Sequence, residues 1–162
     1  MYEKIQKSIL NGLHGTQVHV NPFKALEGLD ADTAKKVPSN GEHSCWQILY
    51  HIVYWQDFML PHLQKEEVKW PRDNKKSWPD NDTLEGEEDW NALITRFKKG
   101  IEEAEEITKT IDSFENLPTD PKIPSYAALM VFIEHNAYHV GQIVTTRQII
   151  GAWPPPEYKK TF

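Results

Sequence analysis

The chain has 162 residues, a formal net charge of −6 and 39% hydrophobic residues, which together predict one globular domain over residues 1–162. A chain of this length buries roughly two-thirds of the surface that its unfolded form exposes, so folding requires neither disulfides nor metal. The acidic charge repels phosphate backbones, and we expect no nucleic-acid partner. Because no run of 18 apolar residues occurs and the charged N-terminus is unlike a signal peptide, we expect no membrane partner and a cytoplasmic location.

Cys45 is the only cysteine, which excludes an internal disulfide and agrees with a reducing compartment. Its thiol is a candidate nucleophile. It lies one residue past a predicted helix cap, however, and no base stands at a patterned distance from it. A structural role is therefore favoured over a catalytic one.

Apolar residues at helical spacing predict an all-α four-helix bundle. The first helix is expected over residues 2–19, although Gly12 and Gly15 weaken its second half. Asn21 and Asp30 are each expected to cap a short helical segment, one over 23–29 and one reaching residue 36.

The second helix is predicted to begin at a capping box made by Ser44 and Gln47. His51 stands in the middle of its apolar stripe, and Pro61 should end the helix within the next turn. The connection over 64–82 lacks periodicity, and its tryptophans, Trp70 and Trp78, are expected to anchor it to the bundle.

The third helix is predicted from Trp90 to Ile111, and a loop, ENLPTDPKIP, leads from it to a fourth helix over 124–151. About ten residues join the last two helices, so we expect them to be antiparallel. The longer connection between the second and third helices could leave that pair parallel.

The fourth helix carries His135 and His139 on an otherwise apolar face. Residues four apart stack on one side of a helix, so the two imidazoles could bind one metal ion. The alternative is a pair of hydrogen-bonded core histidines, and the pattern of this helix alone does not decide between them.

His51 supplies a third histidine on a buried stripe, and the chance of three such imidazoles without a shared site is lower than for one. Three neutral imidazoles suit a divalent transition metal and leave coordination positions open for water or substrate. Asn136 stands where zincin proteases have a glutamate base, which excludes that class. The Glu-x-x-His pairs of di-iron proteins are also missing, so a mononuclear site is favoured.

Motifs in two of the predicted helices resemble a known family. The fourth helix and its tail read His135-Asn-Ala-Tyr-His139-Val-Gly141-Gln142-Ile143, then Arg147, Gly151 and Trp153-Pro-Pro. Together with Trp46 and His51 in SCWQILYHIVYWQDF, these residues resemble the DinB-like (DinB/YfiT-like) metalloenzyme superfamily, the DNA-damage-inducible four-helix-bundle family. The resemblance covers the second and fourth helices and fits the length of the chain.

The resemblance implies an up-down-down-up bundle with a long crossover between the second and third helices, a homodimer and a role in stress response. It also implies a divalent metal held by His51, His135 and His139, with nickel or zinc most common and iron a further option. Characterised relatives include metal-dependent transferases and an isomerase that use low-molecular-weight thiols. A thiol and a small electrophilic molecule are therefore the partners that the resemblance implies.

Three further residues lie near the predicted ligands. Trp55 and Gln142 are one helical turn away and are candidates to line a substrate site, although Trp55 better fits core packing and Gln142 could merely pair with the backbone. Arg147 could bind an anionic substrate or serve the C-terminal end of its helix.

Two functions follow as hypotheses. The first is a mononuclear metal enzyme, a transferase or hydrolase, in which a metal-bound thiolate or hydroxide attacks a small electrophile. The alternative is a non-catalytic bundle that binds a metal or a small ligand. A metal-free core remains a third reading of the three histidines.

Overall fold

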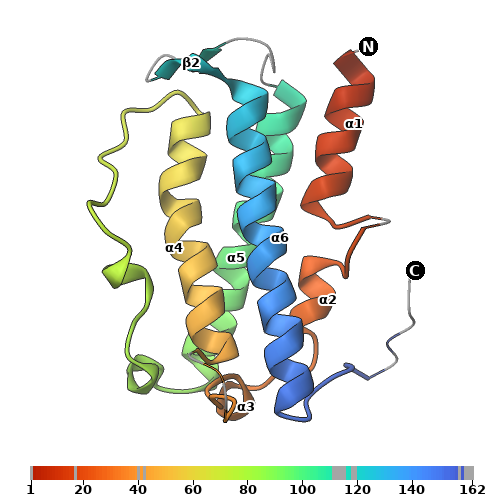
Figure 1. The fold of residues 1–162 in the computed structure, drawn as a ribbon, viewed down its shortest axis with the longest axis vertical. Helices are drawn as coiled ribbons and strands as arrows, with labels where there is room; N and C mark the ends of the chain where they lie inside the picture. Colours follow the sequence, from red (N-terminus) through yellow and green to blue (C-terminus); the bar gives the residue numbers. More distant parts are fainter. Residues whose placement is uncertain are drawn as a thin grey trace.

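In the computed structural model, described for residues 2–16, 18–39, 41, 43–110, 116–117, 120–156 and 158, four long helices lie side by side (Figure 1). They are α1 (Tyr2–Leu13), α4 (Cys45–Leu63), α5 (Glu87–Thr110) and α6 (Ser125–Ile149). Helix α4 packs against α5 and α6, and α1 packs against the same two helices. The predicted all-helical bundle is thus confirmed. Among the described residues, no helix combines the length and apolarity needed to cross a membrane.

The first helix is shorter than predicted. It ends at Leu13, because the chain turns at Gly15, which has a left-handed φ of 65°. The prediction of helix as far as residue 19 was therefore wrong. Two short helices follow, α2 (Pro22–Leu26) and α3 (Ala31–Ala34), with Asn21 and Asp30 as the predicted caps.

Helix α4 begins as predicted. The Ser44 hydroxyl accepts from the Gln47 N–H at 3.2 Å, and the Gln47 side-chain oxygen accepts from the Ser44 N–H at 3.0 Å. Pro61 lies in the last turn, and the helix ends at Leu63. The capping box fixes the start of the helix about two turns before His51 and so determines which way that side chain points.

A long connection over 64–86 joins α4 to α5. In Figure 1 the colours progress upward along α4 and α5 and downward along α1 and α6, and the connection returns along the outside of α4. It contains two 3-10 turns, η1 (Lys75–Ser77) and η2 (Asn81–Thr83), of which η1 contacts α4. The connection thereby brings its own residues against the helix that carries His51.

A short strand pair stands where the sequence predicts a loop. Strands β1 (Asn116–Leu117) and β2 (Asp120–Pro124) pair antiparallel, and β2 leads directly into α6. The proline-rich sequence hid this pairing, because proline cannot donate to a strand ladder. Ile111, the predicted end of the third helix, lies outside the described residues.

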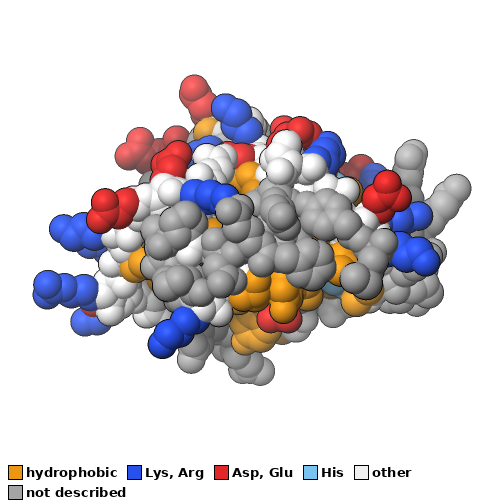
Figure 2. Space-filling model, turned by 90° about the horizontal axis from the view of Figure 1, so that it is seen from above, with side chains coloured by type: hydrophobic (Ala, Val, Ile, Leu, Met, Phe, Trp, Pro, Cys, Tyr) orange, Lys and Arg blue, Asp and Glu red, His pale blue; other side chains and the backbone are white. Residues whose placement is uncertain are grey.

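The core lies between the four long helices. Trp90, Phe97 and Phe132 are among its fully buried side chains. Helices α4 and α5 approach closely where Gln56 occupies the space that a side chain at Gly100 would need. Viewed from the β2 end, charged side chains of both signs are spread around the rim, and the described residues show no face of one sign there (Figure 2).

Candidate metal centre

Three histidines from two helices converge in the bundle. His51 comes from α4, and His135 and His139 lie one turn apart on α6. Each offers one ring nitrogen, and these atoms all lie within 4.8 Å of one another. The Nε2 atoms of His51 and His135 are 3.3 Å apart. Two nitrogens bound at about 2.05 Å to one tetrahedral ion would stand about 3.3 Å apart, so this pair has the spacing of metal ligands.

Ser77 fixes the orientation of the His51 ring. The Ser77 hydroxyl donates to the Asn74 carbonyl at 2.6 Å, which uses its only proton. The same oxygen lies 2.8 Å from His51 Nδ1 and must therefore accept from that nitrogen. His51 thus carries its proton on Nδ1, and its Nε2 lone pair faces the other histidines.

Gln142 does the same for His139. Its side-chain oxygen lies 2.6 Å from His139 Nδ1, and its nitrogen donates to the Tyr138 hydroxyl at 3.4 Å. An amide oxygen can only accept, so His139 Nδ1 carries the proton and Nε2 is left as the coordinating atom.

His135 differs from the other two. Its Nδ1 is buried and forms no hydrogen bond of normal geometry with a described residue, although the neighbouring Asn136 side chain acts to raise the pKa of the ring. Without a metal, His135 Nε2–H could donate at 3.3 Å to the lone pair of His51 Nε2, and the lone pair of His139 Nε2 would then have no donor among the three rings. The donor chemistry of the cluster therefore fits a metal ion better than a hydrogen-bonded core triad.

Burial keeps these imidazoles neutral. It is the main cause that lowers the pKa of His51 from 6.5 to about 3 and the pKa of His135 from 6.5 to about 4, and positive charge on His139 is the second cause in both. Burial also lowers the pKa of His139, against the opposing effect of its hydrogen bond to Gln142. At neutral pH the cluster offers uncharged nitrogens, the form that binds metals.

Metal loading is therefore expected to survive acidification below pH 6.5, the ordinary pKa of histidine. Protons compete with metal for the same lone pairs, and the lowered pKa values weaken that competition. Absorption of the Co(II)-loaded protein, followed from about pH 7.5 to about pH 4.5, should show a midpoint clearly below that of free imidazole. Circular dichroism would check that the fold persists.

The metal-free protein has its own pH dependence. Folded-state pKa values below the unfolded value mean that the unfolded chain binds more protons, so stability falls as pH drops from about 6.5 toward 3.

In the Co(II) titration, loss of the metal centred at the free-imidazole pKa, while the fold persists, would contradict the lowered pKa values.

Aromatic rings surround the cluster. Trp78 from the connection stacks on His51 with ring centroids 3.9 Å apart, and His43 stacks on the other face of Trp78, also at 3.9 Å. Trp55 meets His51 edge-on at 6.3 Å. The connection after α4 thus covers one side of His51 with a flat ring.

The structure places both predicted substrate-lining residues at the cluster, in different positions. Gln142 bonds a histidine and also borders a cavity of about 540 Å³. Trp55 is half-buried and packs against Tyr54 and Phe58 on α4. That cavity is lined by Pro38, Gly41, His43, Ile48, Tyr138, Gly141, Gln142, Thr145, Thr146 and Ile149.

Three neighbours of the cluster were not predicted from the sequence as part of the site, namely His43, Ser77 and Trp78. All three lie outside the long helices, where helical periodicity carries no information. The one available signal was a tryptophan within a polar connection. It predicted that Trp78 anchors the connection to the bundle, but it did not predict that the ring stacks on His51.

Arg147 is engaged by the backbone of its own chain. Its side chain is buried and donates to the backbone oxygens of Ala25, Glu27 and Ala152. Of the two roles expected for Arg147, these bonds favour the structural one at the end of its helix over binding of an anionic substrate.

Cys45 is fully buried, and burial raises the pKa of its thiol to about 12. We expect no reaction with a disulfide reagent such as Ellman's reagent in the folded protein and one equivalent of reaction after unfolding in denaturant. Fast stoichiometric labelling of the folded protein would contradict this and revive the nucleophile hypothesis.

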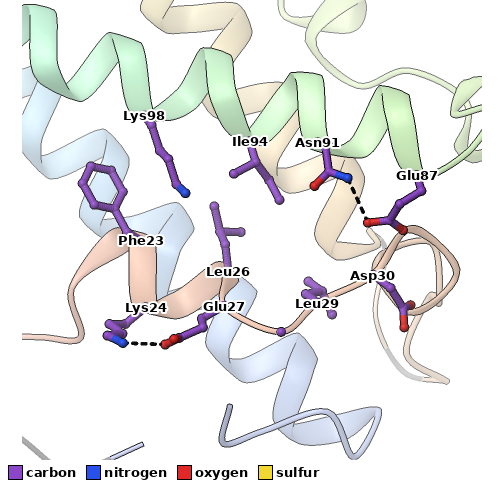
Figure 3. Close-up of a pocket in the computed structure, with 11 residues that line it drawn as sticks. Phe23, Lys24, Leu26, Glu27, Leu29, Asp30, Glu87, Asn91, Ile94 and Lys98 are labelled. Atoms are coloured by element: carbon purple, nitrogen blue, oxygen red, sulfur yellow. Dashed lines mark hydrogen bonds and ion pairs between the residues drawn. The ribbon is translucent and has the colours of Figure 1, made fainter. Parts of the chain in front are cut away.

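A larger cavity, of about 580 Å³, lies away from the histidines between α2 and α5 (Figure 3). Its charged and amide side chains, except that of Lys98, already have partners within the chain. Glu87 accepts from the Ala31 N–H and from Asn91, Asp30 caps α3, and Lys24 pairs with Glu27. Its size alone does not indicate chemistry, and the histidine cluster remains the stronger candidate.

Comparison with protein families matches residues 17–143 to the DinB superfamily. The matched segment contains all three clustered histidines and ends just past Gln142. Comparisons with curated proteins and with solved structures find no match. The family match covers well over half of the chain, and the chain therefore belongs to the DinB superfamily.

Proposed function

We propose that His51, His135 and His139 hold one divalent metal ion and that the protein is a mononuclear metal enzyme. The observation that carries this is the convergence of three neutral imidazole nitrogens within 4.8 Å, two of them oriented by Ser77 and Gln142. Ligands with such hydrogen-bonded partners are typical of metal centres.

The ligand set favours a metal that acts as a Lewis acid. Three neutral ligands leave the full charge of a divalent ion uncompensated, and three protein ligands leave positions open. An ion bound there would act as a Lewis acid that lowers the pKa of a thiol or a water molecule. Nickel and zinc are the metals we propose first, followed by iron, because all three accept imidazole ligands.

Transfer of a low-molecular-weight thiol to a small electrophile is the reaction we propose, with hydrolysis second. Among the described residues, no carboxylate joins the three histidines. Water starts from a pKa of about 15.7 and a thiol from about 8.5, so the same ion would leave more of a bound thiol than of a bound water ionised at neutral pH. Without a carboxylate base from the described residues at the histidines, this difference favours the thiolate over the hydroxide as nucleophile.

A structural or sensing role is the second candidate. His51 and His139 are only 5% and 7% exposed, and Trp78 covers His51, which would also suit a metal that stabilises the fold.

We further propose a homodimer and a role in stress response, both carried over from the family. Light scattering would test the first.

Two measurements test the proposal. Elemental analysis of protein purified without a polyhistidine tag should find about one divalent ion per chain after loading. The metal-loaded form should then conjugate low-molecular-weight thiols to a panel of electrophiles faster than the metal-free form. One metal per chain with no rate above the metal-free control would favour the structural role, and no metal at all would refute the site.

Ser77→Ala should weaken metal binding about 10- to 100-fold, because the His51 ring loses the acceptor that orients it. Competition against a chromophoric chelator measures this. Thr83→Val is the matched control, since Thr83 Oγ1 makes a similar bond to the Asp80 carbonyl in the same connection. Equal metal affinity in Ser77→Ala and the wild type would show that Ser77 does not support the centre.

A further inference from the structure

A third cavity, of about 370 Å³, lies between α4 and the first half of the connection 64–86. It is lined by Tyr54, Phe58, Lys69, Trp70, Pro71, Arg72, Asp73 and Lys76. Three cations and one carboxylate thus gather around one small cavity in a chain whose net charge is −6. A local reversal of charge of this kind attracts anions.

The three cations are not used by the fold. Lys69, Arg72 and Lys76 are exposed, and within the described part of the chain none of them forms an ion pair. Asp73, the one carboxylate of the lining, accepts a hydrogen bond from the Lys75 N–H at 3.0 Å. The positive charge around this cavity therefore remains available to a ligand.

The other part of the lining is aromatic. The rings of Phe58 and Trp70 lie 6.4 Å apart at 30°, and Tyr54 packs on Phe58 at 5.2 Å. Trp70 remains 44% exposed, although tryptophan contributes most when its ring is covered. An exposed indole beside cations offers a flat apolar surface to a ligand that also carries a negative charge.

We propose that this cavity binds a small organic anion with a flat unsaturated or aromatic portion. The carboxylate of the ligand would pair with Arg72, whose guanidinium can bind it with two parallel hydrogen bonds, and with Lys69 and Lys76. The flat portion would stack against Trp70 and Phe58.

The cavity borders the same helix face as the histidine cluster. Tyr54 meets Trp55 at 5.6 Å, and Trp55 meets His51 at 6.3 Å. His51 and Phe58 are seven residues apart on α4, a rise of about 10 Å. If the proposed function holds, an anion held here is the electrophilic substrate, with its reactive end toward the histidines. That last step rests on the proposed function, whereas anion binding does not.

Calorimetric titration of the full chain with 2-naphthoate tests the proposal, with the neutral 2-naphthamide as its isostere. At low salt we expect 2-naphthoate to bind at least about tenfold more tightly than 2-naphthamide, and added salt to reduce this difference. Equal affinity of the two compounds would overturn the proposal.

The triple variant Lys69→Gln, Arg72→Gln, Lys76→Gln should lose this preference. A second triple variant, Lys7→Gln, Lys36→Gln, Lys99→Gln, removes the same charge from exposed sites elsewhere and should keep it. All six side chains are exposed, so both variants are expected to fold. An equal loss in both would show that net charge, and not this cavity, attracts the anion.

The same titration, run on the metal-loaded wild type and on His139→Ala treated in the same way, separates this inference from the proposed function. Binding of 2-naphthoate should persist there, because the cavity contains none of the three histidines. Loss of binding in His139→Ala would mean that the carboxylate had bound the metal, and it would overturn the separate anion site while supporting the metal centre.

Discussion

Replacing His139 with alanine is expected to abolish stoichiometric metal binding. The loss should exceed the 10- to 100-fold typical of removing a partner that only orients a ligand, so we expect more than about 100-fold. Elemental analysis after loading and desalting would measure it, and chelator competition would give the affinity. His51→Ala and His135→Ala should behave alike, because each removes one of three convergent nitrogens.

The three substitutions should not be additive. Once one ligand is gone, the remaining two no longer hold the ion at the measured concentration, so a second substitution has little left to remove. His19→Ala is the matched control. His19 bonds the neighbouring Val20 carbonyl and does not belong to the cluster, so its loss should leave metal content unchanged.

Thermal unfolding offers an independent readout of the same site. A ligand that binds only the folded state stabilises it by about 4 kcal/mol at a thousandfold excess over its dissociation constant. The wild type should therefore unfold at a higher temperature with metal than without, and His139→Ala should show no such shift. A full metal complement in His139→Ala would exclude this histidine as a ligand.

Sequence periodicity predicted the parts of the site that lie on long helices. His51 stands on a helix whose start is set by the Ser44 capping box, and His135 and His139 stand four residues apart on α6. Since helix geometry is regular, spacing along the sequence gave the direction of all three side chains. Their convergence was an expectation from the sequence and is an observation in the structure.

The residues that orient and cover the histidines could not be predicted in this way. Ser77 and Trp78 reach His51 only because the connection after α4 folds back along that helix. The path of this connection depends on tertiary packing, and the sequence of the connection has no hydrophobic periodicity from which the path could be predicted. The early end of α1 at Leu13 has a local cause, since Gly15 adopts a left-handed conformation that periodicity does not register.

Replacing Arg147 with methionine should destabilise the protein by about 3 to 5 kcal/mol, because it leaves several buried acceptors unpaired. Arg147 is 1% exposed, and its guanidinium donates to Ala25 O at 2.6 Å, to Glu27 O at 3.0 Å and to Ala152 O at 3.0 Å. The first two acceptors belong to the end of α2, and the third follows α6. One side chain therefore joins the end of α2 to the end of α6, two segments that are distant in sequence.

Thermal unfolding would measure this effect, and for a chain of this size we expect a decrease of roughly 10 to 15 °C. Arg96→Met is the matched control. Arg96 pairs with Asp57 at 2.7 Å, but the two side chains are 54% and 55% exposed, so its loss should cost less than about 1 kcal/mol. Arg147→Lys should fall between them, because an ammonium group cannot reach three acceptors in the fixed geometry of a guanidinium.

The position of Arg147 also separates stability from chemistry. It lies two helical turns beyond His139, so loading the folded variant with metal should still give one ion per chain if the guanidinium serves only to join segments. A variant with unchanged stability and lost affinity for an organic anion would instead make Arg147 part of a ligand site. Its three backbone acceptors argue against that outcome, since a guanidinium bound to them has few donors left for a substrate.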